Sequence, residues 1–140
     1  ILNTLGIGLL GPALIHHGSE EQRRRFIPPM LAGDEIWCQG FSEPGAGSDL
    51  ASLKASARLD GDHFVLNGQK VWTTFGPWSD WIFVLARTDP DDRYGGITFF
   101  LVPLNRALRS LEIVAGANLT HRLIHRIGDF LFVDFRNDII

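Results

Sequence analysis

Two short segments combine residue types that could bind a phosphorylated molecule carrying a flat ring. Residues 43–49 read EPGAGSD, and such closely spaced glycines let backbone N–H groups converge on an anion, with the hydroxyls of Ser42 and Ser48 as further donors. Residues 72–74 read WTT, an aromatic side chain followed by two hydroxyl groups. A flavin nucleotide needs both, because its ring is flat and its polar edge must be hydrogen-bonded. The residues alone leave a plain turn and an aromatic core strand equally open.

A dinucleotide-binding pattern near the start of the chain lacks the context that it requires. Residues 6–11 read GIGLLG, which matches GxGxxG, and Asp34 and Glu35 follow at a suitable distance for a ribose contact. The motif must, however, follow a buried strand and open a full helix within a βαβ unit. Pro12 and Gly18 leave too short a crossover. We therefore interpret this stretch as a buried helix in which glycines allow close packing.

Three other candidate functional residues or motifs are better explained without a catalytic or metal-binding role. Ser42 stands in GFSEP, which is not a complete GxSxG nucleophile elbow. His121 and His125 are spaced as in HExxH, but the glutamate is missing, so we predict no metal site. Cys38, the only cysteine, follows a tryptophan in an apolar run and is interpreted as a small core residue. We name no catalytic residue.

Composition narrows the class of protein. The net charge is −3, which argues against a nucleic-acid partner because such proteins concentrate positive charge on one face. No stretch reaches the roughly 18–20 unbroken apolar residues of a membrane span. The single cysteine favours a reducing compartment, and we expect a cytoplasmic location. The apolar opening lacks a basic region and a cleavage site, so we expect an internal fragment of a longer protein.

The first 35 residues are predicted to be helical. Leu2, Leu5 and Leu9 recur at helical spacing, and Pro12 limits that helix. The pattern SEEQ at residues 19–22 is a capping box that starts a second helix. We expect this helix to end before the pair of prolines at 28–29, because a residue that precedes proline is pushed out of the helical region. Gly33 and Asp34 then form a turn.

The remainder of the chain is predicted to be β structure. Residues 52–59 alternate between apolar and polar side chains, which indicates a half-buried strand. The pairs at 60–61 (Asp-Gly) and 67–68 (Asn-Gly) predict turns, the second a hairpin. Residues 81–88 and 97–103 are rich in β-branched and aromatic residues. The predicted fold class is α+β: short N-terminal helices followed by an antiparallel β-barrel or orthogonal β-sandwich.

The stretch from residue 37 to residue 88 resembles the middle domain of the acyl-CoA dehydrogenase family. Its motifs are GFSEPGAGSD at 40–49 and LNGQKVWTT at 66–74, in the family's order and spacing. Upstream, GSEEQRRRFIPPMLAGDE at 18–35 is similar to the end of the family's N-terminal helical domain. The resemblance implies that residues 1–35 end a helical domain and that residues 36–140 form the middle β domain. The C-terminal helical domain would then be absent from this chain.

The family likeness also implies roles for individual residues. Phe41 and Ser42 would meet the flavin ring, and Gly47 and Ser48 would follow the ribityl–pyrophosphate, with Ser48 also close to the pantetheine of the substrate. Gln39 stands where many members have an aromatic residue, so it would keep only a backbone contact. The remaining cofactor-binding residues, which would cover the ring and hydrogen-bond its edge, are Trp72, Thr73 and Thr74.

The function implied by the resemblance is FAD-dependent oxidation of an acyl-CoA to the 2,3-enoyl-CoA. The implied partners are an electron-transfer flavoprotein and further copies of the same protein. The family's carboxylate base lies in its C-terminal bundle, which no position here matches, so the chain alone is expected to be inactive. An acyl-CoA oxidase, a flavin monooxygenase on the same scaffold, or a non-catalytic β module that binds a ligand remains open.

The likeness to the family weakens after Pro103. Residues 110–114 and 130–135 are candidates for the last two strands, whereas residues 119–127 do not fit the family pattern. Whether the predicted barrel closes after residue 104 is therefore left open.

Overall fold

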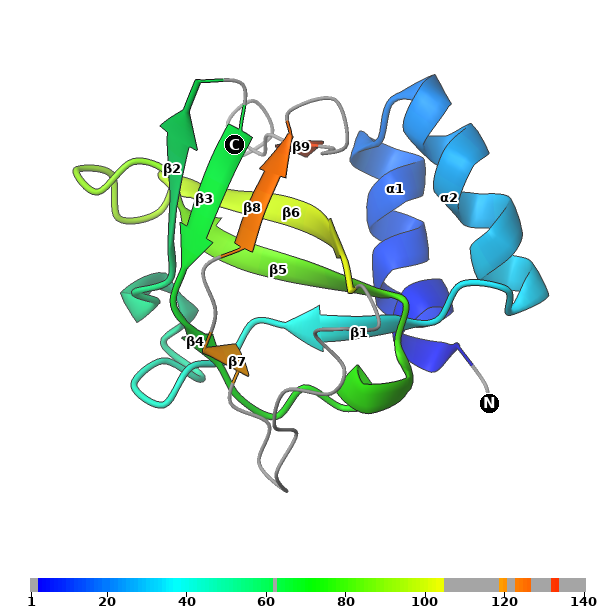
Figure 1. Cartoon of the computed structure of the whole chain (residues 1–140), viewed down its shortest axis with the longest axis horizontal. Coiled ribbons are helices and arrows are strands. Elements are labelled where there is room, and N and C mark those ends of the chain that lie inside the picture. The colour runs from blue at the N-terminus through cyan, green and yellow to red at the C-terminus, as the bar shows by residue number, and fades with distance from the viewer. Residues whose placement is uncertain (1–2, 62, 105–118, 121–122, 127–131, 134–140) are drawn as a thin grey trace.

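The computed structural model describes residues 3–61, 63–104, 119–120, 123–126 and 132–133 (Figure 1). Two helices pack side by side at one end of a twisted sheet. One loop of the candidate site follows strand β1 (Trp37–Gly40) of this sheet, and the other follows β4 (Gln69–Lys70) of a smaller sheet. The helical start and β remainder agree with the predicted α+β class. No helix in the described part of the chain is both long and apolar enough to cross a membrane.

The glycine-containing start of the chain is helical, as the interpretation of GIGLLG predicted. A π-helical segment, Gly6–Leu10, leads directly into α1, Gly11–His17. The helical path continues through Pro12, which lies in the first turn of α1, so the prediction that Pro12 limits the helix is wrong. Gly6 and Gly11 are buried, as expected where helices pack closely.

Helix α2, Glu20–Ala32, begins at the predicted capping box but ends later than predicted. The N–H of Gln22 is bound by the Ser19 hydroxyl, and the Gln22 side chain accepts the N–H of Ser19. Both prolines at 28–29 lie inside the helix, so the predicted end before them is wrong. Phe26 and Met30, on either side, are buried in the core, and this tertiary packing outweighs the local cost. Gly33 ends the helix with a φ of 79°.

The strands form one large sheet and one small one. The large sheet has the order β8-β3-β2-β5-β6-β9, with β1 also paired to β5, and the small sheet pairs β4 with β7. Two short 3-10 helices, η2 (Leu50–Ser52) and η3 (Gly76–Trp78), lie in the loops. The strands are β1 (Trp37–Gly40), β2 (Ser56–Asp60), β3 (His63–Asn67), β4 (Gln69–Lys70), β5 (Trp81–Arg87), β6 (Ile97–Pro103), β7 (Leu119–Thr120), β8 (Leu123–Arg126) and β9 (Phe132–Val133).

The large sheet is mixed, which corrects the prediction of an antiparallel barrel or orthogonal sandwich. Both β1 and β2 run parallel to β5: Gly40 lies opposite Val84, and Ser56 lies opposite Arg87. They therefore act as one interrupted strand, and residues 41–55 leave the sheet between them. Among the described strands, the two ends of the sheet, β8 and β9, do not pair with each other, so no closed barrel is observed.

One of the two predicted turns is confirmed, and the other is not a hairpin. Gly61, with a φ of 64°, turns the chain between the antiparallel strands β2 and β3. The Asn-Gly pair at 67–68 instead separates β3, which pairs with β2 and β8, from β4, which pairs with β7. A Cβ atom on Gly68 would lie 2.5 Å from the Cβ of Ala55. Glycine is therefore needed there for a close approach between segments.

Each face of the sheet carries a hydrophobic cluster. Alternate residues of β5, such as Phe83 and Leu85, face the helices, and Ile82 and Val84 face the other way. The helix-side cluster includes Leu10, Leu14, Phe26 and Met30 from the helices and Trp37, Phe99 and Leu101 from the strands. The helices and the sheet therefore share one continuous core.

The side chain of Asn3 connects the first helix to the entry of β1. Its Nδ2 donates to the carbonyl oxygens of Met30, at 3.1 Å, and Glu35, at 2.8 Å. Its Oδ1 accepts the N–H of Trp37 at 3.1 Å. Asn3 is buried, so these hydrogen bonds satisfy backbone groups that water cannot reach.

Several predictions concern the end of the chain. Strand β9 lies within the predicted strand 130–135, and β7 and β8 lie within residues 119–127. Residues 110–114 and His121 lie outside the described residues.

Candidate functional site

The first candidate segment is a tight turn at the end of β1. Glu43 and Ala46 bond each other through their backbones: the N–H of Glu43 donates to the Ala46 oxygen at 2.8 Å, and the N–H of Ala46 donates back at 3.1 Å. Glu43 and Ala46 are buried, whereas Pro44 and Gly45 between them are exposed. We call residues 43–49 the phosphate loop. Its start is thus closed by its own backbone, and its tip is exposed.

The second candidate segment is strained. Trp72 is 78% exposed and has a φ of 59°, in the left-handed region that non-glycine residues rarely adopt. Phe75 has a φ of 65° and caps the short helix η3. Strain at an exposed aromatic residue is typical of functional sites, because the surrounding fold must maintain it. We call residues 72–74 the ring segment.

The ring segment presents its side chains in two directions. Trp72 and Thr74 are exposed, whereas Thr73 is only 5% exposed. The hydroxyl of Thr73 is buried and has no hydrogen-bond partner among the described residues. Such an orphaned hydroxyl carries a desolvation cost that a partner would relieve.

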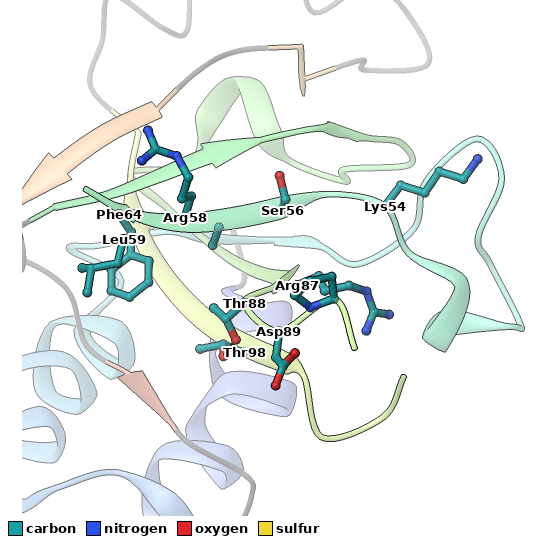
Figure 2. Close-up of a pocket in the computed structure, with 11 residues that line it drawn as sticks. Lys54, Ser56, Arg58, Leu59, Phe64, Arg87, Thr88, Asp89 and Thr98 are labelled. Atoms are coloured by element: carbon teal, nitrogen blue, oxygen red, sulfur yellow. Dashed lines mark hydrogen bonds between the residues drawn. The ribbon is translucent and has the colours of Figure 1, made fainter. Parts of the chain in front are cut away.

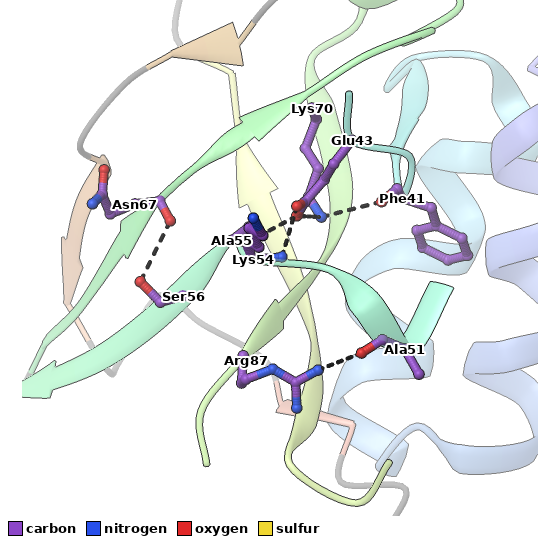
Figure 3. A network of polar contacts seen from close by, with 9 residues as sticks. All are labelled: Phe41, Glu43, Ala51, Lys54, Ala55, Ser56, Asn67, Lys70 and Arg87. Atoms are coloured by element: carbon purple, nitrogen blue, oxygen red, sulfur yellow. Dashed lines mark hydrogen bonds and ion pairs between the residues drawn. The ribbon is translucent and has the colours of Figure 1, made fainter. Parts of the chain in front are cut away.

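The structure brings the two segments together. The N–H of Val71 donates to the carbonyl oxygen of Ser42 at 2.9 Å, directly between the phosphate loop and the ring segment. The ammonium group of Lys70 donates to the carbonyl oxygen of Phe41 at 3.1 Å, as Figure 3 shows. Ser42 and Trp72, which are separated by about one-fifth of the chain, are therefore placed within one local surface.

A buried ion pair lies beneath this junction. The Lys70 ammonium donates to Oε1 of Glu43 at 2.8 Å, and the two side chains are only 5% and 6% exposed. Glu43 also accepts the N–H of Lys54 at 2.7 Å and that of Ala55 at 2.9 Å (Figure 3). Burial alone would raise the pKa of Glu43, but these three donors lower it below its ordinary value. Burial lowers the pKa of Lys70, and Glu43 partly offsets that effect.

The far end of the phosphate loop is held by other contacts. Gly47 and Ser48 are exposed, and Asp49 forms an ion pair with Arg93 at 3.1 Å. A Cβ atom on Gly47 would meet nothing within 4 Å, and its φ lies outside the left-handed region. The described protein does not itself require glycine at this position, so there is room for a ligand to approach the backbone closely.

Gln39 and Phe41 line an apolar cavity between α1 and the sheet. The cavity has a volume of about 440 Å³. The ring of Phe41 packs edge-on against Phe83 and Phe99, at centroid distances of 5.6 and 6.0 Å. The other lining residues are Leu9, Ala13, Leu50, Leu85, Tyr94 and Ile97. This hollow can hold an aliphatic group, and it opens beside the residues predicted to meet the ring.

A second hollow, of about 1020 Å³, lies over β2, β5 and β6 and contains none of the predicted site residues (Figure 2). The positively charged side chains that line this hollow do not point toward a common ligand position. The Arg87 guanidinium donates to the carbonyl oxygens of Ala51, Asp92 and Arg93. Arg58 pairs with Asp60 at 2.9 Å, and Figure 2 shows Lys54 pointing away from Arg87. We assign no binding role to this hollow.

Comparison with known families shows to which family the chain belongs. The family model for the acyl-CoA dehydrogenase middle domain matches residues 38–122. The chain belongs to the acyl-CoA dehydrogenase family. Among acyl-CoA dehydrogenases, IpdE1 of Mycobacterium tuberculosis is 54% identical over 106 residues, which cover 75% of this chain but 28% of that protein. The chain thus spans less than a third of this curated relative.

Solved structures share this fold. The Tcur3481-Tcur3483 steroid ACAD matches with a TM-score of 0.78 at 30% identity, covering 91% of this chain and 35% of that one. The prolyl acyl carrier protein oxidase AnaB matches with a TM-score of 0.65 at 36% identity, covering 68% of this chain and 25% of that one.

Sequence reasoning missed two residues that join the predicted segments of this acyl-CoA dehydrogenase family member. Glu43 and Lys70 lie inside the recognised motifs, but neither was singled out. In the sequence, Lys70 stands within a short β run and Glu43 stands before a Pro-Gly turn. Neither pattern indicates that these two residues, which are far apart in the sequence, contact each other. Cys38 behaves as the core residue predicted: burial raises the pKa of its thiol to about 12.

Proposed function

We propose that this chain is the flavin-binding part of an FAD-dependent acyl-CoA dehydrogenase. The whole enzyme would oxidise an acyl-CoA to the 2,3-enoyl-CoA and pass the electrons to an electron-transfer flavoprotein. Residues 1–35 would end its helical domain and residues 36–140 would form its middle β domain. The observation that supports this proposal is the Val71–Ser42 hydrogen bond, which sets the phosphate loop beside the ring segment.

The residues present fit a flavin. Trp72 offers an exposed aromatic face, and the buried hydroxyl of Thr73 lacks a partner among the described residues. The exposed backbone at Gly47 is open to close approach. A flat ring with a polar edge and a diphosphate tail matches these three features.

Each residue then has a defined task. Phe41 and Ser42 would meet the ring, with a backbone contact from Gln39, and Trp72 would cover the ring. Gly47 and Ser48 would hold the ribityl–pyrophosphate, with Ser48 also touching the pantetheine. The hydroxyls that would bond the polar edge of the ring are those of Thr73 and Thr74.

When bound, the flavin supplies the hydride acceptor. The acyl chain would enter the apolar cavity beside Phe41, which excludes water from the reacting carbons. A base must be positioned because the α proton of a thioester is weakly acidic. We propose that this base belongs to the part of the relatives that the present chain does not match.

Spectroscopy of the full-length protein that carries this chain tests the proposal. The purified protein should be yellow, and an acyl-CoA should bleach it without oxygen. A panel of straight-chain and steroid-linked acyl-CoAs would identify the substrate class. A colourless protein that takes up no FAD would refute the proposal.

A single hydroxyl provides a sharper test. Thr74→Val should weaken FAD binding by about 1–3 kcal/mol, because a polar group at the ring edge loses its partner. Thr98→Val is the matched control, since its hydroxyl bonds that of Thr88 on the sheet at 2.7 Å, away from both segments. Equal FAD affinity in the two variants would count against the assignment of Thr74.

An acyl-CoA oxidase is the second candidate, favoured by the likeness to the oxidase AnaB. The two functions differ in what accepts the electrons. If the reduced protein reacts rapidly with oxygen and releases peroxide, the oxidase is correct. If it reacts slowly with oxygen but reduces an electron-transfer flavoprotein, the dehydrogenase is correct.

A further inference from the structure

The buried ion pair joins the two proposed halves of the flavin site at their origins. Glu43 is the first residue of the phosphate loop, and Lys70 lies two residues before Trp72. The pair is closed by a 2.8 Å contact, and Lys70 also bonds the carbonyl oxygen of Phe41. Both ends of the pair are therefore attached to segments that would meet the cofactor.

The pair differs from the other ion pairs of the described residues. The side chains of Arg24–Glu20, Arg58–Asp60 and Arg93–Asp49 are all more than half exposed, and those of Arg25–Glu35 are 48% and 21% exposed, so solvent reaches and weakens each of these pairs. A buried pair is a poor source of stability, because removing two charges from water is costly. Its geometry is nevertheless tightly specified, since each charged group needs its partners in place.

The carboxylate of Glu43 also determines where the loop begins. It accepts the N–H groups of Lys54 and Ala55, which follow the loop where the chain returns toward β2. The backbone of Glu43 simultaneously closes the turn with Ala46. One side chain thus connects the start of the loop, the return of the chain and Lys70.

We propose that Glu43 and Lys70 are positioning residues that fix the phosphate loop relative to the ring segment, so that one FAD molecule contacts both at once. This inference rests on the proposed function. A flavin that bridges two segments binds tightly only when their separation is set beforehand, because otherwise binding must order them. The pair sets this separation without touching the cofactor.

The test uses the full-length protein and three variants: Glu43→Gln, Lys70→Met and the double variant. Each single variant should weaken FAD binding by about 10- to 100-fold, since a small misplacement of a site can cost this much. At saturating FAD, the visible circular dichroism of the bound flavin should also change. The double variant should lose no more than either single variant, because the pair acts as one unit.

The control is Arg58→Met, which removes the cation of an exposed pair on the same sheet and should change FAD affinity less than twofold. If Lys70→Met does not fold, Glu43→Gln and the uncharged double variant decide the question. Variants that are less stable but keep wild-type FAD affinity and circular dichroism would show a purely structural pair and overturn the inference. A wild-type protein without FAD would instead refute the proposed function.

Discussion

The left-handed backbone of Trp72 leads to a prediction about stability. An L-residue in this region costs about 1–2 kcal/mol relative to a right-handed conformation, and glycine avoids that cost. Glycine in turn loses about 0.5–1 kcal/mol relative to alanine through its larger conformational entropy. Because Trp72 is 78% exposed, both truncations remove little packing. Trp72→Gly should therefore be more stable than Trp72→Ala by about 0.5–1 kcal/mol.

The assay is urea unfolding of the two apoprotein variants, compared through their midpoints and slopes. Leu59 provides the control, because it is 54% exposed within strand β2, where the backbone has no positive φ. There the order should reverse, with Leu59→Ala more stable than Leu59→Gly. Both variants of Trp72 lack the indole, so both should lose FAD equally. If Trp72→Ala equals or exceeds Trp72→Gly in stability, the fold does not impose the left-handed conformation.

Three further predictions concern buried groups. Thr73→Val should raise the free energy of unfolding of the apoprotein by about 1 kcal/mol, because it removes a buried hydroxyl that has no hydrogen-bond partner in the described part of the chain; a marked loss in urea unfolding would show that the hydroxyl has a partner. The ionised carboxylate of Glu43 contributes stability that is complete above its ordinary pKa of 4.5 and is lost as the pH falls through its lowered folded pKa. After correction for intrinsic rates, hydrogen exchange at the N–H groups of Lys54 and Ala55 should accelerate as the pH falls through the lowered pKa of Glu43. The Glu43→Gln variant should not show this acceleration. Cys38 should resist iodoacetamide at pH 8 in the folded protein and react after unfolding, because the pKa of its thiol is raised to about 12; fast labelling of folded protein would contradict its burial.

Local patterns in the sequence were enough to predict local structure. The capping box at Ser19 and Gln22 formed as predicted, because its partners lie three residues apart. The strand 97–103 was predicted to the residue, since β-branched and aromatic residues mark it. The helix end before the prolines at 28–29 was wrong because burial of neighbouring residues outweighed the local preference.

Non-local pairing could not be read from the sequence. The parallel contact of β1 with β5 joins Trp37 to Trp81, and nothing near either residue specifies the other. The same holds for the ion pair of Glu43 and Lys70. The resemblance to a family identified the two segments of the candidate site, whereas only the structure shows the contacts that hold them side by side.

The hydrogen bond from Asn3 to Trp37 and the shared hydrophobic core connect the helical segment to the sheet, so we expect the two to unfold together. A chain trimmed to residues 36–140 would leave the N–H of Trp37 without its acceptor, at about 1–3 kcal/mol for a buried group. It would also uncover the apolar face of Phe83 and Phe99. Protease cleavage in the first helix should consequently destabilise the sheet as well, so that helices and sheet unfold in one transition rather than two.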